Sequence, residues 1–250
     1  MENKYKLTEE SVVFFGITLY RIEALKDFAD IKKGDKGGYV QSEANLSQEG
    51  NCWVLDDAKV YDSARVSDNA LVYGNAQVYG NAKVYGDAQV YSSVLVYDNA
   101  KVFGEAKVFD TALVCGNAQI CGNALICDNA FVDDNAVVCG NARVFGDAKV
   151  CNNAEIFDNA LISGNAKIYG NTQIRSSAKV ENNTDYIVFK NWWSSGRYFT
   201  WTKSNNMWAV GCFYGTGEEL IAKAYKDSEL SGREYERVVK YIESMLQDGK

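Results

Sequence analysis

A six-residue repeat fills the central half of the chain and restricts its fold more than any other feature. At every sixth position, from residue 52 to residue 178, the side chain is small, and nineteen of these 22 residues are alanine. Two positions after each of them stands valine or isoleucine, in all 22 repeats and without an insertion or deletion. The exceptions to alanine are Cys52, Val94 and Thr172. So short and regular a period predicts a solenoid with one short strand and one corner per repeat.

Strand geometry explains the pattern. Alternate side chains of a strand point to opposite faces, so the outer residues of Ala82-Lys83-Val84 face the interior and the lysine faces solvent. Pairs such as Gly74-Asn75 and Asp98-Asn99 separate the strands, and these residue types tolerate the left-handed backbone conformation of a sharp corner. Proline would remove a ladder hydrogen bond in a coil, and the chain contains no proline.

The repeat resembles that of the hexapeptide-repeat superfamily, whose members fold as left-handed parallel β-helices with three-sided coils. The resemblance implies a little over seven coils of 18 residues, about 35 Å long at the usual strand spacing of about 4.8 Å. The segment that leads into the repeat resembles the leader of an uncharacterised hexapeptide-repeat family. Members of this family occur in bacterial and phage genomes and are often labelled as transferases. The residues that carry this likeness are Leu19-Tyr20-Arg21-Ile22, Gly37-Gly38-Tyr39-Val40 and Leu46 to Val54. The resemblance covers residues 1–182 and implies a phage or prophage origin, but no settled activity.

The predicted fold class is mainly β, a parallel β-helix with additions at both ends. Residues 1–50 are expected to form an N-terminal β cap, residues 51–182 the β-helix, and residues 183–250 a small C-terminal α+β module. The strands expected outside the repeats lie at 11–15, 18–22, 185–190, 197–202 and 207–214. Helices are expected at 217–227 and 231–247, the second starting at Ser231 with Glu234 three residues later.

Charge and hydropathy limit the partners. The net charge of −7 is spread along the chain and no basic segment stands out, so nucleic-acid binding is not expected. No apolar run approaches the roughly 20 residues of a membrane helix, and the N-terminus does not read as a signal peptide. We therefore expect a protein of the bacterial host cytoplasm, without membrane contact, whose seven cysteines are mostly reduced.

The absence of histidine removes several chemistries. The hexapeptide-repeat acyltransferases that the chain resembles use a histidine as general base, and the γ-class carbonic anhydrases of similar fold hold zinc with three. Nucleophile pairs of serine or cysteine with histidine are excluded as well, and no glycine-rich phosphate loop precedes a helix. We expect no catalytic residue and no cofactor.

Five cysteines follow the inward valine or isoleucine, where other repeats carry tyrosine or phenylalanine: Cys115, Cys121, Cys127, Cys139 and Cys151. Residues 18 apart should stack, which places Cys121 below Cys139 and puts Asp133 between Cys115 and Cys151. Because no Cys-x-x-Cys pair occurs, we favour apolar corner fillers over a metal site.

Two surfaces are candidate contact sites. One outward column carries three consecutive apolar residues, Leu95, Leu113 and Phe131, and such a stripe favours self-association as a trimer or dimer, although it could also dock the C-terminal module. In that module, Trp192, Trp193, Arg197 and Tyr198 are a candidate recognition surface, because aromatics and arginine are common anchors. The alternative is that these aromatics form the core of the module.

These features favour a non-enzymatic binding or scaffold protein that binds a host protein or sequesters a small ligand, as a counter-defence inhibitor encoded by a phage would. One alternative is a transferase-like enzyme with a non-histidine site at a subunit interface. Another is a structural or assembly protein, such as a virion component.

Overall fold

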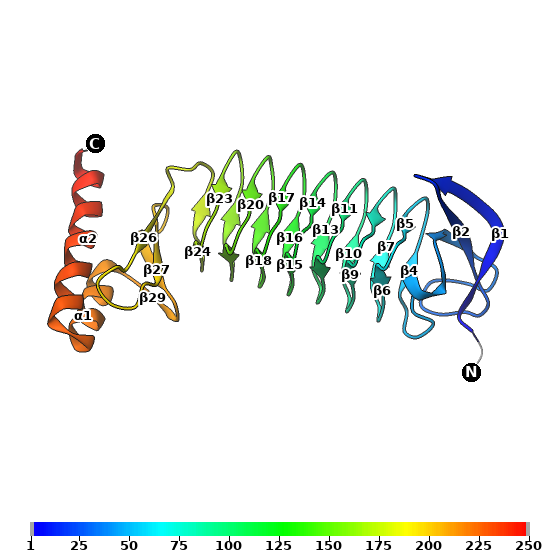
Figure 1. Ribbon diagram of the computed structural model, residues 1–250, viewed down its shortest axis with the longest axis horizontal. Helices are drawn as coiled ribbons and strands as arrows, with labels where there is room; N and C mark the ends of the chain where they lie inside the picture. Colours follow the sequence, from blue (N-terminus) through cyan, green and yellow to red (C-terminus); the bar gives the residue numbers. More distant parts are fainter. Residues whose placement is uncertain (1–2, 249–250) are drawn as a thin grey trace.

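Two-residue strands, one per repeat, stack into three parallel sheets that form an elongated prism (Figure 1). The computed structural model describes residues 3–248. Each strand pairs in parallel with the strand 18 residues later, as Val96 does with Val114. The predicted parallel β-helix with three-sided coils of 18 residues is thereby confirmed.

The first sheet begins with two antiparallel strands of the cap, and its other members are parallel. In order they are β1 (Tyr5–Phe14), β2 (Ile17–Ala24), β3 (Lys36–Val40), β5 (Lys59–Val60), β8 (Gln77–Val78), β11 (Leu95–Val96), β14 (Leu113–Val114), β17 (Phe131–Val132), β20 (Lys149–Val150) and β23 (Lys167–Ile168).

The second sheet has eight strands and the third has seven. The second contains β4 (Trp53–Val54), β7 (Leu71–Val72), β10 (Gln89–Val90), β13 (Lys107–Val108), β16 (Leu125–Ile126), β19 (Arg143–Val144), β22 (Leu161–Ile162) and β25 (Lys179–Val180). The third contains β6 (Arg65–Val66), β9 (Lys83–Val84), β12 (Lys101–Val102), β15 (Gln119–Ile120), β18 (Val137–Val138), β21 (Glu155–Ile156) and β24 (Gln173–Ile174).

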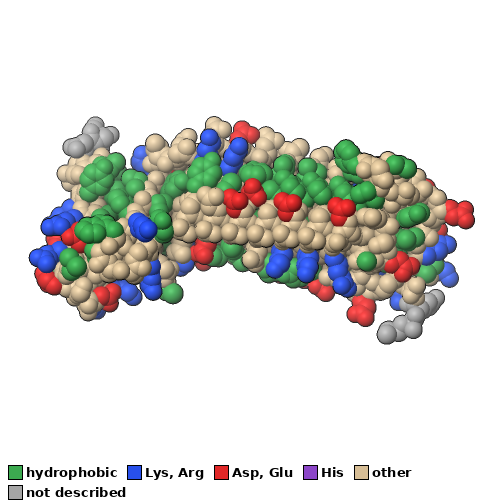
Figure 2. All heavy atoms as spheres, viewed as in Figure 1, with side chains coloured by type: hydrophobic (Ala, Val, Ile, Leu, Met, Phe, Trp, Pro, Cys, Tyr) green, Lys and Arg blue, Asp and Glu red, His purple; other side chains and the backbone are tan. Residues whose placement is uncertain are grey.

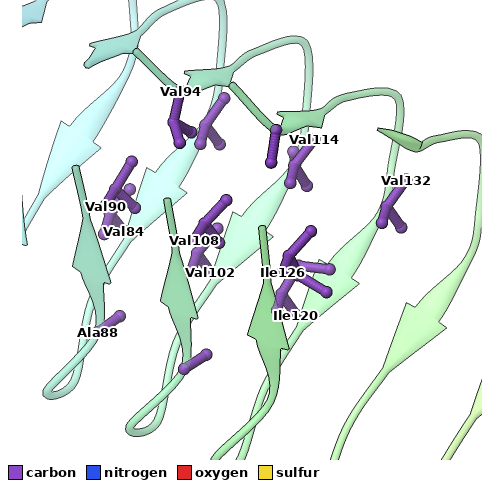
Figure 3. Close-up of a cluster of buried hydrophobic side chains, with 14 of the residues drawn as sticks. Val84, Ala88, Val90, Val94, Val102, Val108, Val114, Ile120, Ile126 and Val132 are labelled. Carbon is purple, nitrogen blue, oxygen red and sulfur yellow. The ribbon is translucent and has the colours of Figure 1, made fainter. Parts of the chain in front are cut away.

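The interior of the prism consists of the small and β-branched residues of the repeat, which are almost all fully buried. Figure 3 shows valines and isoleucines of successive coils stacked in columns that point inward, such as Val90, Val108 and Ile126. The backbone joins the coils, because each coil donates N–H groups to carbonyls of the next, as Tyr97 does to Val114 at 3.0 Å. Burial of every repeat therefore depends on its neighbours, as in other solenoids.

The N-terminal segment adds one coil to those counted from the repeat. β3 pairs in parallel with β5, and Leu46, just after the short 3-10 helix η1 (Glu43–Asn45), forms a parallel bridge to Val66. The solenoid consequently has about eight turns rather than seven. The hairpin of β1 and β2 continues the sheet beyond β3 with antiparallel pairing and covers its edge.

The C-terminal module is a four-stranded antiparallel sheet with two helices. Its elements are β26 (Tyr186–Lys190), β27 (Tyr198–Thr202), β28 (Met207–Val210), β29 (Phe213–Gly215), α1 (Gly217–Asp227) and α2 (Glu229–Asp248). The strand expected at 207–214 is two strands, because the chain turns at Gly211, which has φ +55°. The second helix begins two residues earlier than expected, with the Ser228 hydroxyl accepting from the N–H of Ser231 at 3.1 Å. Ser231 is buried within the helix instead of starting it.

Side chains of the module bind the last coil of the solenoid. The N–H of Gln173 donates to the Thr200 hydroxyl at 3.1 Å, and that of Lys179 to the Ser204 hydroxyl at 2.7 Å. The Tyr186 hydroxyl donates to the carbonyl of Lys167 at 2.7 Å. The module thus covers the strand edges where the repeat ends. Within residues 3–248, neither helix is long and apolar enough to span a bilayer.

Candidate ligand-binding cleft

A cleft of about 390 Å³ lies in the C-terminal module, between the segment that follows β26 and the two helices. Its floor is apolar, with Val210, Phe213 and Leu220. Its polar lining residues include the buried Asn191 and Tyr235 and the exposed Ser194, Arg197, Lys223 and Asp227. The volume lies within the range of small-molecule sites, so a ligand of modest size fits.

Asn191 organises one wall of the cleft. Its side chain is buried, and its Oδ1 accepts from both the N–H and the hydroxyl of Ser194, at 2.9 and 3.0 Å. Its Nδ2 donates to the Tyr235 hydroxyl on α2 at 3.2 Å, and its N–H donates to the carbonyl of Arg197 at 2.7 Å. Both arms of the amide are satisfied, which holds the turn 191–197 in one conformation against α2.

Two cations face the cleft without a carboxylate partner. Among residues 3–248, the side chains of Arg197 and Lys223 form no ion pair within 4 Å. The Lys223 ammonium lies 5.8 Å from the ring centroid of Phe213. Asp227 is the one carboxylate among the described lining residues. The rim therefore carries a surplus of one positive charge, in a chain whose net charge is −7.

The same charges act on a buried phenol. Burial raises the pKa of Tyr235, the Asn191 hydrogen bond and Arg197 lower it, and Asp227 raises it. Tyr235 therefore stays neutral at physiological pH and serves as a hydrogen-bonding group. Its ring packs edge-on against Trp193 and Phe199, with centroids 5.1 and 5.0 Å apart.

The four residues of the candidate recognition surface have different environments. Arg197 lines the cleft, and Trp193 packs against the core of the module. Trp192 is 78% exposed and Tyr198 is 39% exposed, the latter with the Lys190 ammonium 5.6 Å from its ring. No sequence pattern pointed to Lys223 or Asn191 as site residues, because the helix and the turn that carry them meet only in the folded module.

Leu95, Leu113 and Phe131 lie on adjacent rungs of the first sheet, in direct register. All three are half-buried. Figure 2 shows apolar side chains gathered along the upper edge of the prism, where β11, β14 and β17 lie. The stripe is thus continuous over three rungs.

The corner cysteines stack as the spacing predicted, but two of them are not free thiols. Cys121 and Cys139 form a disulfide between adjacent coils, which corrects the expectation of reduced thiols for this pair. Stacking at the corner places the two sulfur atoms side by side, and this proximity permits the bond. The other five cysteines are free.

One group of potential metal ligands occurs at a corner. The ligand atoms of Asp110, Cys127 and Asp128 lie within 4.8 Å of one another. Burial raises the pKa of Cys127 to about 11, and both carboxylates act in the same direction. The thiol is protonated at neutral pH, and a protonated thiol is a poor metal ligand.

Comparison with known proteins supports the solenoid. Residues 64–76 and 76–92 match a protein-family model described as YdcK Beta solenoid repeat. A stretch of 61 residues is 39% identical to a protein of Escherichia coli (strain K12) named Uncharacterized acetyltransferase YdcK. That stretch is 21% of this chain and 19% of the other protein, so about a fifth of each is matched.

Proposed function

We propose that this chain, a member of the hexapeptide-repeat β-helix superfamily, is a non-enzymatic binding protein for a small anion. The cleft of its C-terminal module carries two cations that form no ion pair among residues 3–248. The observation that carries this proposal is that Arg197 and Lys223 line the same cleft. The solenoid serves as the rigid support of the C-terminal module.

The chemistry of the rim favours a phosphate or carboxylate group. A guanidinium offers a planar fork of N–H donors that suits both anions, and an ammonium adds a point charge. The hydroxyl of Ser195 adds a neutral donor beside Arg197. The apolar floor accommodates the uncharged part of such a ligand.

The resemblance of the leader to phage-borne proteins bears on the source of the ligand. A host metabolite, a host signalling molecule or an anionic group of a host protein would each meet the cleft in an infected bacterium. Exposed Trp192 and Tyr198 are then contacts for a larger partner.

Binding is tested by isothermal titration calorimetry with inorganic phosphate, pyrophosphate and a nucleoside monophosphate. We expect Arg197→Gln and Lys223→Gln each to weaken binding at least tenfold. The matched control is Lys226→Gln on the same helix, whose side chain is exposed and does not line the cleft. Equal affinity of Arg197→Gln and the wild type, or no binding of any anion, would reject the proposal.

Acetyl transfer is the second candidate, because the matched relative is named an acetyltransferase. The chain has no histidine to act as the base, so such an activity would need another group with a shifted pKa. Release of free thiol from acetyl-CoA, measured with a range of amine and hydroxyl acceptors, decides between the two. If acetyl-CoA is turned over and no single substitution in the cleft abolishes this turnover, the reaction takes place elsewhere on the chain.

A further inference from the structure

Three basic side chains stack on consecutive coils of the third sheet. Arg65 pairs with Lys83, and Lys83 pairs with Lys101, in direct parallel register. Figure 2 shows basic side chains projecting in a row from the lower edge of the prism, over β6, β9 and β12. The three side chains line a groove of about 340 Å³ together with Ser67 and Tyr85.

The basic row is unusual for this solenoid. The outward columns of the repeats contain no other run of three like charges on adjacent coils. Like charges directly opposite one another on neighbouring strands are destabilising, and adjacent rungs are only about 4.8 Å apart. A sequence that merely needed polar outward residues could place glutamine here, as it does at Gln119 on the next coil.

No carboxylate compensates the row within the groove. All five lining residues are basic or uncharged, and none of the three cations forms an ion pair among residues 3–248. Arg65 also borders a second hollow, which contains Glu43 and Glu49 of the cap. The charges of Lys83 and Lys101 are therefore the least compensated of the three.

The groove has an aromatic wall with one open side. The ring of Tyr85 stacks on that of Phe103, with centroids 4.9 Å apart. On the preceding coil, the same column holds Ser67, whose small side chain leaves the other side of the Tyr85 ring without an aromatic neighbour. A flat ring can stack there beside the cations.

From this arrangement we propose that the groove binds a linear polyphosphate anion. The phosphate chain lies along the row of cations, because both are linear and the sheet holds the cations on a rigid backbone. The open side of Tyr85 also accepts the base of a nucleoside polyphosphate. This site is separate from the cleft of the C-terminal module and does not depend on the function proposed for it.

The test uses as its parent the full chain carrying Arg197→Gln and Lys223→Gln, so that the cleft contributes no binding. Each further substitution is made in this parent. Inorganic triphosphate is the probe, and affinity is measured by calorimetry at two ionic strengths. We expect Lys83→Gln and Lys101→Gln each to weaken binding at least tenfold, and higher salt to weaken binding to the parent. The control is Lys107→Gln, an exposed outward lysine of the second sheet. Binding that Lys83→Gln leaves unchanged would overturn the proposal.

Thermal unfolding without ligand separates binding from misfolding. Because Lys83→Gln relieves repulsion, its midpoint should equal or exceed that of the parent, while the stabilisation by triphosphate is lost. ATP distinguishes the two ligand sources. If ATP binds more tightly than triphosphate and Tyr85→Leu removes the difference, the groove is assigned to nucleoside polyphosphates. If the two ligands bind with equal affinity, the groove is assigned to inorganic polyphosphate. ATP binding that Lys83→Gln leaves unchanged would contradict both assignments of the groove.

Discussion

The Lys4 ammonium lies 2.9 Å from the carbonyl oxygen of Cys52 and 3.2 Å from its Sγ. It also donates to the carbonyls of Glu49 and Gly50, both at 3.3 Å. Each coil donates N–H groups to the carbonyls of the next, so the first full coil has carbonyls that no preceding repeat can serve. Lys4, which directly precedes β1, supplies these donors, and burial lowers its pKa.

Replacement of Lys4 by methionine should destabilise the solenoid by about 3 kcal/mol, since it leaves the buried Cys52 carbonyl and two partly buried carbonyls without this donor. The free energy of unfolding from urea denaturation measures the loss. Lys6→Met is the control, because Lys6 is half exposed and its ion pair with Glu23 is a surface pair worth less than about 1 kcal/mol. Equal stability of the two variants would show that the Lys4 contacts contribute little.

Substitution in the apolar stripe should change the assembly of the protein without unfolding it. Leu113→Asp and Phe131→Lys place charges on half-buried outward positions, where a partner copy would have to desolvate them. Native mass spectrometry should show a trimer or dimer for the wild type and monomers for both variants. Gln119→Asp on the third sheet is the control and should leave the assembly unchanged. An unaltered oligomer in the stripe variants, with native circular dichroism, would exclude the stripe as the interface.

The free thiols should differ strongly in alkylation rate. Burial raises the pKa of Cys127 and of Cys151 to about 11, and nearby carboxylates add to the effect. Their reaction with iodoacetamide at pH 8 should be slow and should rise about tenfold per pH unit toward that pKa, because the thiolate is the reactive form. Peptide mapping should find exposed Cys212 modified first. Modification of Cys121 or Cys139 without prior reduction would show that the disulfide is absent.

The asparagine ladder at one corner should contribute a modest stability. Asn117 accepts from Asn99 at 3.2 Å and donates to Asn135 at 3.1 Å, in an exposed row. Asn117→Ala removes two hydrogen bonds and should cost about 1 kcal/mol, measured by urea denaturation. Asn81→Ala removes only the bond to Asn99 and should cost about half as much. A larger loss for Asn81 than for Asn117 would show that the ladder bonds are not the cause.

The helix at 217–227 was predicted with its observed bounds, because a capped amphipathic segment carries its own signal. Thr216 and Glu219 form the two reciprocal hydrogen bonds of the cap, at 3.2 and 2.8 Å. The start of the second helix was misplaced, since Ser228 and Ser231 are equally good caps in sequence and only packing selects one.

The repeat by itself determined the solenoid, since an inward alanine and valine in every hexad leave one periodic way to bury them. Periodicity also determined which residues stack, including Cys121 on Cys139 and the outward column of Arg65, Lys83 and Lys101. Only the tertiary structure decided that β3 extends the solenoid, that Lys4 reaches Cys52, and that Trp193 faces the core while Trp192 does not. It also decided that Arg197 and Lys223 share a cleft. These contacts join non-repeating segments far apart in the chain, where no local pattern indicates which surfaces will meet.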